Sequence, residues 1–270
     1  MMKTFNNSSR EDVFSFLEDK IKEADALLGH HEYMMIGSYV RDIHLRRAGI
    51  KSPRGTQDLD LSLVAREFAD FERALDSFRP PRGVITRRKL GEVPVDIIPF
   101  GPIARGGHLE HGDSHWELRG LQEAYDSAEL CIIGDSSVKI PQIYAMMGLK
   151  IIVWGERAFP TDCTDFHHLL VASCKILDES GELWESPLWE DEDVIEQCEG
   201  NPELLAAYSA GRKLAVLFAG VALERCIEIL ADPGNREVFV ITALRDYRDP
   251  RTNSNYKKMY EVFFLGIRTI

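Results

Sequence analysis

The sequence lacks an apolar run long enough to cross a membrane, and its first twenty residues mix acids with apolar residues, unlike a signal peptide. It also lacks a CxxC pair, and its odd number of cysteines suits reduced thiols better than a disulfide framework. The five cysteines are Cys131, Cys163, Cys174, Cys198 and Cys226. We therefore expect a cytoplasmic globular protein that does not bind membranes.

Basic residues are in short supply: 32 Lys and Arg face 44 Asp and Glu, which gives a formal net charge of −12. Nucleic-acid binding usually depends on basic side chains that displace counterions from phosphates, so the net charge disfavours it. One short stretch could override this locally as a basic patch. It contains Arg79, Arg82, Arg87, Arg88 and Lys89. The alternative is an ordinary solvated loop and strand face.

The first half of the chain alternates between helical and strand patterns. Helical spacing of apolar residues predicts helices over residues 11–28, 39–48 and 67–78. Strands are predicted over 33–36, 59–63, 84–89 and 93–100, the last two joined at Leu90-Gly91-Glu92. The stretch Gly101 to His115 is rich in Gly and His and is predicted to be a long surface loop.

The second half is mainly helical in pattern. Helices are predicted over residues 142–154, 162–177, 191–198 and 203–230, with Pro and Gly at the joins. The expected fold is α+β: a small mixed β-sheet with flanking helices, followed by a helical C-terminal region. We expect a catalytic core at residues 1–140 and a helical region at 141–270 that completes a nucleotide cleft.

Three aspartates are candidates for a metal site. Asp58 and Asp60 share one face of a strand because side chains repeat every two residues, and Asp96 lies on a following strand between apolar neighbours. A lone buried carboxylate is costly, so Asp96 needs a cation or a hydrogen-bond partner. Magnesium prefers such oxygens. The alternative is that Asp58 caps the strand, Asp60 faces solvent and Asp96 pairs with an arginine.

Gly37 and Ser38 stand between a predicted strand and a predicted helix. A glycine at such a turn lets backbone N–H groups approach phosphate oxygens, and the helix N-terminus favours negative charge. The serine hydroxyl can donate a further hydrogen bond. The alternative is a simple helix cap. Together with the aspartates, the turn favours binding of a nucleoside triphosphate.

This order of motifs resembles the nucleotidyltransferase superfamily, whose members place a Gly-Ser turn before a D-x-D strand and a third Asp on a later strand. The closer resemblance is to the AbiEii/AbiGii toxin-like family. It runs through Val95-Asp96-Ile97-Ile98-Pro99-Phe100-Gly101, Gly120-Leu121-Gln122-Glu123-Ala124 and Gly148-Leu149-Lys150-Ile151-Ile152-Val153-Trp154, and continues through Arg157, Asp162 and Asp165.

The resemblance implies a nucleotidyltransferase that uses Asp58, Asp60 and Asp96 with magnesium or manganese. It implies that Lys150 contacts the triphosphate and that Asp162 or Asp165 supports nucleotide binding or the lysine. The acceptor would be an RNA end or a protein hydroxyl, and a separately encoded antitoxin would be a partner. The alternatives are a small-molecule acceptor, as in antibiotic-modifying enzymes, and an inactive nucleotide-binding or interaction module.

Three histidines of the predicted loop, His108, His111 and His115, could gather zinc with Glu110 and Asp113, although their spacing matches no strong zinc signature. His167 and His168 are expected on a helix surface. Tyr247 and Tyr256 lie among basic residues and could stack on a single-stranded RNA end. The alternative is an ordinary basic helix edge.

Overall fold

The computed structural model describes residues 11–52, 55–56, 58–78, 86–111 and 114–269. The chain divides into two compact units: Met1–Val40 with Pro53–Gln142, and Arg41–Ser52 with Ile143–Ile270. The dividing point at residue 40 falls inside helix α2 (Gly37–Arg47), so residues 41–52 belong to the second unit. The division into domains at residues 1–140 and 141–270 stays a prediction.

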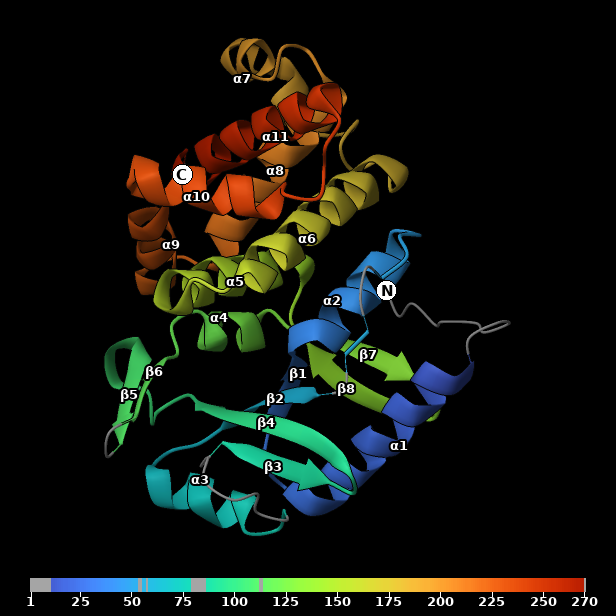
Figure 1. Cartoon of the computed structure of the whole chain (residues 1–270), viewed down its shortest axis with the longest axis vertical. Helices are drawn as coiled ribbons and strands as arrows, with labels where there is room; N and C mark the ends of the chain where they lie inside the picture. The colour runs from blue at the N-terminus through green and yellow to red at the C-terminus, as the bar shows by residue number, and fades with distance from the viewer. Residues whose placement is uncertain (1–10, 53–54, 57, 79–85, 112–113, 270) are drawn as a thin grey trace. The chain divides into compact units, whose positions relative to one another are not determined.

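A four-stranded mixed sheet forms the centre of the first unit (Figure 1). Its order is β1 (Tyr33–Ile36), β2 (Leu59–Val64), β4 (Val93–Phe100) and β3 (Arg87–Leu90). Strands β2 and β4 run parallel, whereas β1 and β3 pair antiparallel with their neighbours. With the helices around it, this sheet confirms the predicted α+β class.

Alternation along β2 and β4 sorts apolar residues to the core. Leu59, Leu61 and Leu63 are buried on β2, and Val95 and Ile97 are buried on β4. Because successive strand residues point to opposite faces, the polar residues between them share the other face. The predicted period-two pattern is thus present in the strands that carry Asp60 and Asp96.

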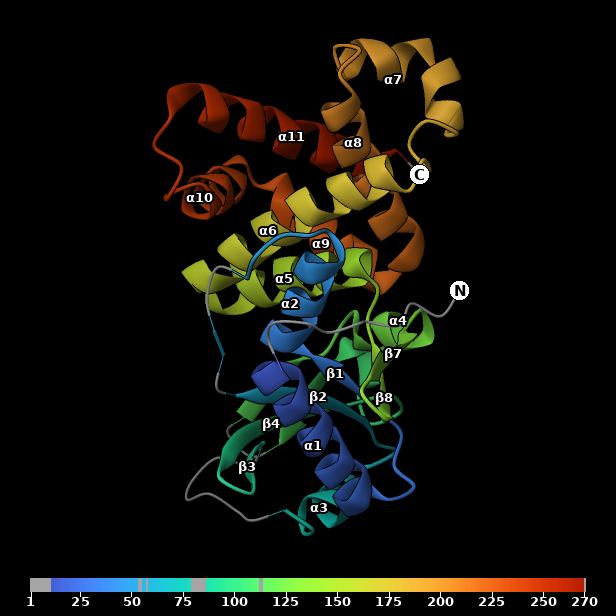
Figure 2. The same ribbon diagram turned by 90° about the vertical axis from the view of Figure 1, so that its right-hand side faces the viewer.

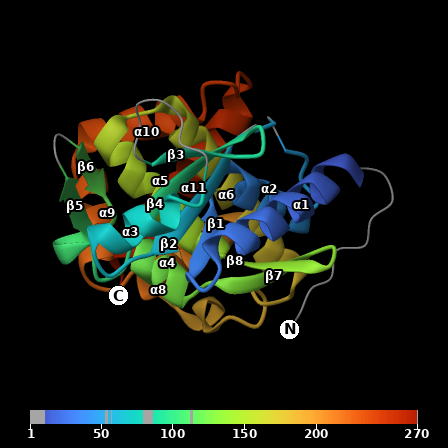
Figure 3. The same ribbon diagram turned by 90° about the horizontal axis from the view of Figure 1, so that it is seen from below.

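Three further helices and two hairpins lie in the described part of the first unit. The helices are α1 (Glu11–Leu28), α3 (Phe68–Leu75) and α4 (Leu121–Asp126), and the hairpins are β5 (His108–His111) with β6 (Ser114–Glu117) and β7 (Glu129–Ile133) with β8 (Ser136–Ile140). Helix α1 packs along the β7–β8 hairpin (Figure 3), and β8 lies beside β1. The predicted loop at 101–115 is wrong over residues 108–111 and 114–115, which belong to the paired strands β5 and β6.

The second unit is helical. It comprises residues Arg41 to Arg47 of α2, then α5 (Ile143–Arg157), α6 (Pro160–Glu179), α7 (Glu192–Gln197), α8 (Pro202–Leu217), α9 (Val221–Ala231), α10 (Pro233–Ala243) and α11 (Pro250–Arg268). The helix predicted over 203–230 is wrong as a single element, because α8 ends before Gly220, whose φ is +85°, and α9 begins after it. Asp232 and Asp249 cap α10 and α11, which the apolar pattern did not predict.

Helices α8 and α11 pack most closely in this unit (Figure 2). A Cβ added at Gly211 would lie 2.2 Å from the backbone oxygen of Phe263, and one at Gly266 would lie 2.3 Å from that of Tyr208. Glycine at both positions therefore allows the two backbones to touch. No helix in the described part of the chain is long and apolar enough to span a bilayer.

Candidate functional site

Asp60 lies directly against the first turn of α2. Ile36, the last residue of β1, pairs with Asp60 across the sheet, and α2 begins at the next residue, Gly37. A Cβ added at Gly37 would lie 1.9 Å from Asp60 Oδ2, and Gly37 has a φ of +73°. Only glycine satisfies both conditions. The predicted Gly-Ser turn is thus the helix start itself, with a carboxylate beside it.

Gly37→Ala is expected to lower the free energy of unfolding by about 2 kcal/mol, since it adds a steric clash to left-handed strain. Gly29→Ala is the matched control, because Gly29 also has a positive φ of +59° but has no atom within 4 Å of an added Cβ. Urea unfolding of both variants measures the difference. Equal losses for the two variants would contradict the close approach of Asp60 to α2.

The structure brings Asp60 and Asp96 next to each other. They are directly paired in the register of the parallel strands β2 and β4, which lie roughly 4.8 Å apart in any sheet. Asp58 precedes β2 by one residue. All three side chains are partly exposed, as a site open to a ligand requires. The sequence-predicted carboxylates therefore gather at neighbouring positions of one sheet.

Arg87 is the residue of this site that the motifs did not reveal. It lies opposite Asp96 in the antiparallel pair of β3 and β4. Its guanidinium donates to Asp58 Oδ2 at 2.8 Å and lies 3.8 Å from Asp96 Oδ2. Of the residues in the predicted basic patch, Arg87 thus contacts carboxylates. Arg79 and Arg82 lie outside the described residues.

The surroundings of Asp96 raise the pKa of its carboxyl group. Partial burial raises its pKa above the usual range, the positive charge of Arg87 opposes the rise, and the negative charge of Asp58 adds to it. A raised pKa makes Asp96 a better proton acceptor than an ordinary surface carboxylate. This agrees in chemistry with a role as general base.

Carboxylate oxygens on adjacent strands are the donors that a hard divalent cation prefers. As the side chains stand, no three His, Cys, Asp or Glu residues in the described part of the chain are close enough to share one ion. The only positive charge between Asp58 and Asp96 among the contacts described above is the Arg87 guanidinium. The donor set fits a divalent metal, and an arginine currently supplies the countercharge.

The zinc alternative fails for the described residues. The ring of His111 stacks on Phe68 with centroids 3.5 Å apart, and the rings of His108 and His115 stack on each other at 5.7 Å. His111 thus packs against Phe68, whereas His108 and His115 pack against each other, and the three imidazoles with their acidic neighbours form no metal-binding group among the described residues. Asp113, the remaining member of that hypothesis, lies outside the described residues.

Lys150 forms the centre of a charged network in the second unit. Its ammonium lies 3.0 Å from Asp162 Oδ1 and 2.9 Å from Asp165 Oδ2. Each aspartate also binds an arginine: Arg157 lies 2.9 Å from Asp162, and the fully buried Arg41 lies 2.5 Å from Asp165. The structure thus brings the predicted lysine and both predicted aspartates together.

Both aspartates of this network are buried, with 0% exposure. Burial raises the pKa of Asp165, but the opposite charges and hydrogen bonds of Lys150 and Arg41 outweigh it and hold the pKa below the usual range. Asp165 is therefore ionised, and it fixes the lysine to α2. Sequence reasoning missed Arg41, since nothing local to α2 indicates a partner 124 residues away.

His167 is not on the surface, and that prediction is wrong: the residue is 1% exposed. Its ring meets Tyr247 and Tyr256 edge to face, with centroids 4.8 and 4.6 Å away. Neither imidazole nitrogen has a hydrogen-bond partner within the described residues, and burial lowers the pKa of His167 to about 3. The two tyrosines thus cover a neutral histidine. Their stacking on an RNA end stays a prediction.

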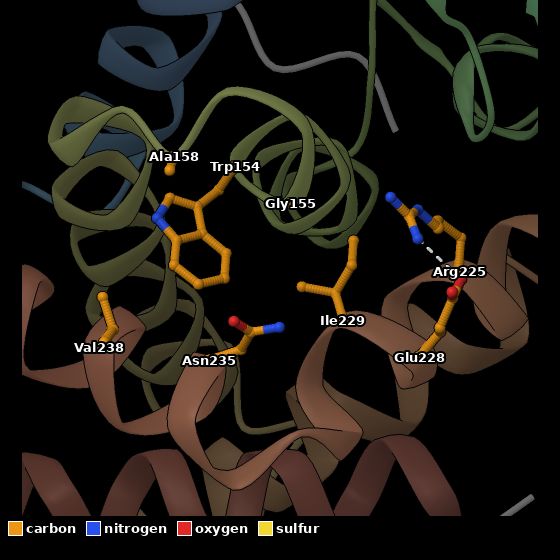
Figure 4. A pocket seen from close by; sticks show the side chains of 8 residues that line it. All are labelled: Trp154, Gly155, Ala158, Arg225, Glu228, Ile229, Asn235 and Val238. Atoms are coloured by element: carbon orange, nitrogen blue, oxygen red, sulfur yellow. Dashed lines mark hydrogen bonds and ion pairs between the residues drawn. The ribbon is translucent and has the colours of Figure 1, made fainter.

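A separate pocket of about 280 Å³ opens in the second unit (Figure 4). Trp154 and Ile229 give it apolar walls, and Asn235 points between them. Arg225 and Glu228, at its edge, form an ion pair. None of the sequence-predicted site residues lines this pocket.

No model of a known protein family matches the chain, and no curated protein matches its sequence. Among solved structures, the chain is similar to a solution structure of the antibiotic-resistance factor ANT(2'')-Ia (13% identity, TM-score 0.40, covering 68% of this chain and 97% of that one). It is also similar to a crystal structure of ANT(2'')-Ia with adenylyl-2''-tobramycin (15% identity, TM-score 0.39, covering 63% and 92%). Similarities this weak assign neither a family nor a function.

Proposed function

We propose that this protein is a metal-dependent nucleotidyltransferase that moves a nucleoside monophosphate from a nucleoside triphosphate to a hydroxyl acceptor. One observation carries the proposal. Asp60 and Asp96 are in register on adjacent parallel strands, and the same Asp60 carboxylate lies against Gly37 at the N-terminus of α2. A carboxylate pair beside a helix N-terminus suits a metal and the phosphates that it binds.

In this proposal Asp58, Asp60 and Asp96 hold magnesium or manganese, and the backbone of Gly37 and Ser38 binds phosphate oxygens. When bound, such an ion would supply positive charge to the triphosphate and to the attacking and leaving oxygens. Asp96 also acts as the general base and accepts the proton of the acceptor hydroxyl at a carboxylate oxygen. The hydroxyl oxygen then bonds to the α-phosphorus, and pyrophosphate leaves.

Lys150 is proposed to contact the triphosphate, with Asp162 and Asp165 as its supports. Two aspartates hold its ammonium, and only 13% of its side chain is exposed, so its position is fixed before any ligand arrives. A preorganised cation loses little side-chain entropy on binding phosphate. The aspartates therefore serve the lysine, which is one of the two roles that the family resemblance implied.

The acceptor is proposed to be an RNA end, and a small molecule is the alternative. Residues 176–211 hold eleven Asp and Glu and no Lys or Arg, so this segment carries a formal charge of −11 and the remaining residues together only −1. All eleven acidic side chains are exposed. The net charge of the chain thus reflects one segment and does not disfavour RNA elsewhere. Membership of the AbiEii-like family and an antitoxin partner stay predictions.

Asp60→Asn is expected to reduce nucleotide transfer at least about 100-fold, because loss of a metal ligand removes several kcal/mol of transition-state stabilisation. Release of pyrophosphate from each nucleoside triphosphate, with RNA and with hydroxylated small molecules as acceptors, measures it. Asp70→Asn, a change of a half-buried carboxylate in α3 of the same unit that pairs with Arg73, is the control. Transfer that survives in Asp60→Asn at the wild-type rate would refute the assignment.

A further inference from the structure

Arg87 bridges two of the proposed metal ligands. Its two terminal nitrogens are directed to different aspartates: Nη2 to Asp58 at 2.8 Å and Nη1 to Asp96 at 3.8 Å. The cross-strand register of β3 and β4 sets this position, because it places Arg87 directly opposite Asp96. The backbone of the hairpin therefore brings Arg87 within reach of both carboxylates.

From this geometry we propose that Arg87 is a built-in competitor of the metal: it neutralises Asp58 and Asp96 in the free protein and must release them before a divalent cation can bind. The inference rests on the proposed function, since it concerns the same carboxylates. It adds a regulatory step that the motifs do not contain, namely that the site exchanges one cation for another.

Two physical reasons support exchange over simultaneous binding. A guanidinium stays charged at every physiological pH, so a dication between the same carboxylates would meet its full repulsion. Arg87 is also free to leave, because its side chain is 43% exposed and β3 is an edge strand. Water screens a partly exposed ion pair, so the arginine weakens metal binding without preventing it.

The competition also sets an order of events. With Arg87 in place, its positive charge partly neutralises the two carboxylates, and the free protein binds the ion alone more weakly than it would without the arginine. A triphosphate brings negative charge that can attract the displaced guanidinium, so metal bound to nucleotide is favoured over free metal. The site would then take up its ion together with the nucleotide.

The test is binding of Mn²⁺, without nucleotide, to the full chain by isothermal titration. Arg87→Gln is expected to bind Mn²⁺ about tenfold more tightly than wild type. This factor is at the low end of the effect expected from removing one competing charge at contact distance, because solvent screens the interaction. Arg87→Lys keeps the charge and is expected to stay within about threefold of wild type. Thermal unfolding of each variant verifies that it is folded.

Lys89→Gln is the matched control, because it removes the same charge two residues along the same strand, where Lys89 pairs with Glu92. It is expected to leave Mn²⁺ affinity unchanged within about twofold. If Arg87→Gln binds Mn²⁺ no more tightly than wild type, the proposal that Arg87 competes with the metal is overturned, whereas the proposed metal site is not. Absence of Mn²⁺ binding in both proteins would overturn the metal-dependent function together with it.

Discussion

Asp165→Asn is expected to lower the free energy of unfolding by about 3 to 5 kcal/mol, the range for breaking a buried ion pair from one side. Asp165 is fully buried and pairs with both Arg41 and Lys150. The asparagine keeps the shape but removes the negative charge, so two cations lose a shared partner in a region shielded from water. Urea unfolding at pH 7 measures the change.

The control for this variant is Asp178→Asn, an exposed position on the same helix α6. Its loss is expected to be below about 1 kcal/mol, as for surface polar changes. The contribution of Asp165 also has a pH signature. Because its pKa is lowered in the folded protein, its stabilisation is present above the unfolded-state pKa and is lost as pH falls through the folded value. Losses that are equal at positions 165 and 178 would contradict the buried network.

His167 is expected to make the protein sensitive to mild acid. Its pKa is about 3 in the folded chain, where it is buried and neutral, whereas an unfolded histidine takes up a proton below about pH 6.5. Between these two pKa values the unfolded state binds a proton that the folded state does not. His167 therefore lowers the free energy of unfolding by about 1.4 kcal/mol for each pH unit of acidification. By pH 4 the loss reaches about 3 kcal/mol. Stability measured by urea unfolding from pH 7 to pH 4 gives the slope.

His167→Phe is expected to flatten this slope, since phenylalanine fits an aromatic cluster and cannot be protonated. It also removes two buried nitrogens that lack partners within the described residues. His115→Gln, a change of a histidine whose side chain is 55% exposed, serves as the control and is expected to keep the wild-type slope. If His167→Phe retained the full acid sensitivity, the neutral buried histidine would not be its source.

The fold was predictable where the pattern is local. Alternating leucines indicated β2, and helical spacing indicated α1, α5 and α6, because burial of one face follows directly from these periods. The hairpins β5–β6 and β7–β8 and the helices α10 and α11 were missed. Strands β5 and β6 are rich in His, Glu and Ser and carry little apolar alternation, whereas β7 and β8 are five-residue strands that do contain apolar residues. Helices α10 and α11 are marked mainly by Asp-Pro caps at Asp232 and Asp249.

The candidate site was predictable only in part, and Arg87 shows why. A turn at Leu90-Gly91-Glu92 was predicted, and a two-residue turn at Gly91 and Glu92 would place Arg87 opposite Asp96 by counting along both strands. The position of Arg87 could therefore have been predicted from the sequence, but only by deriving the strand register and not by searching for motifs. Asp58 and Asp60 needed only the period-two rule.

Long-range partners could not be predicted from the sequence. Arg41 and Asp165 are far apart in the chain, and their contact depends on the packing of α2 against α6 within the second unit. His167 likewise depends on Tyr247 and Tyr256, which come from a later loop and helix. A helical pattern with two adjacent histidines gives no sign of which face meets tyrosines. These contacts follow from tertiary packing that periodicity does not encode.

The most direct test of the central claim is isothermal titration of the full chain with each nucleoside triphosphate, with and without magnesium, repeated on Asp58→Ala/Asp60→Ala. The account predicts binding that requires magnesium in the wild type and that the double variant loses while it remains folded. Absence of nucleotide binding by the folded wild type would contradict the nucleotidyltransferase assignment, as would binding that is unchanged in the variant.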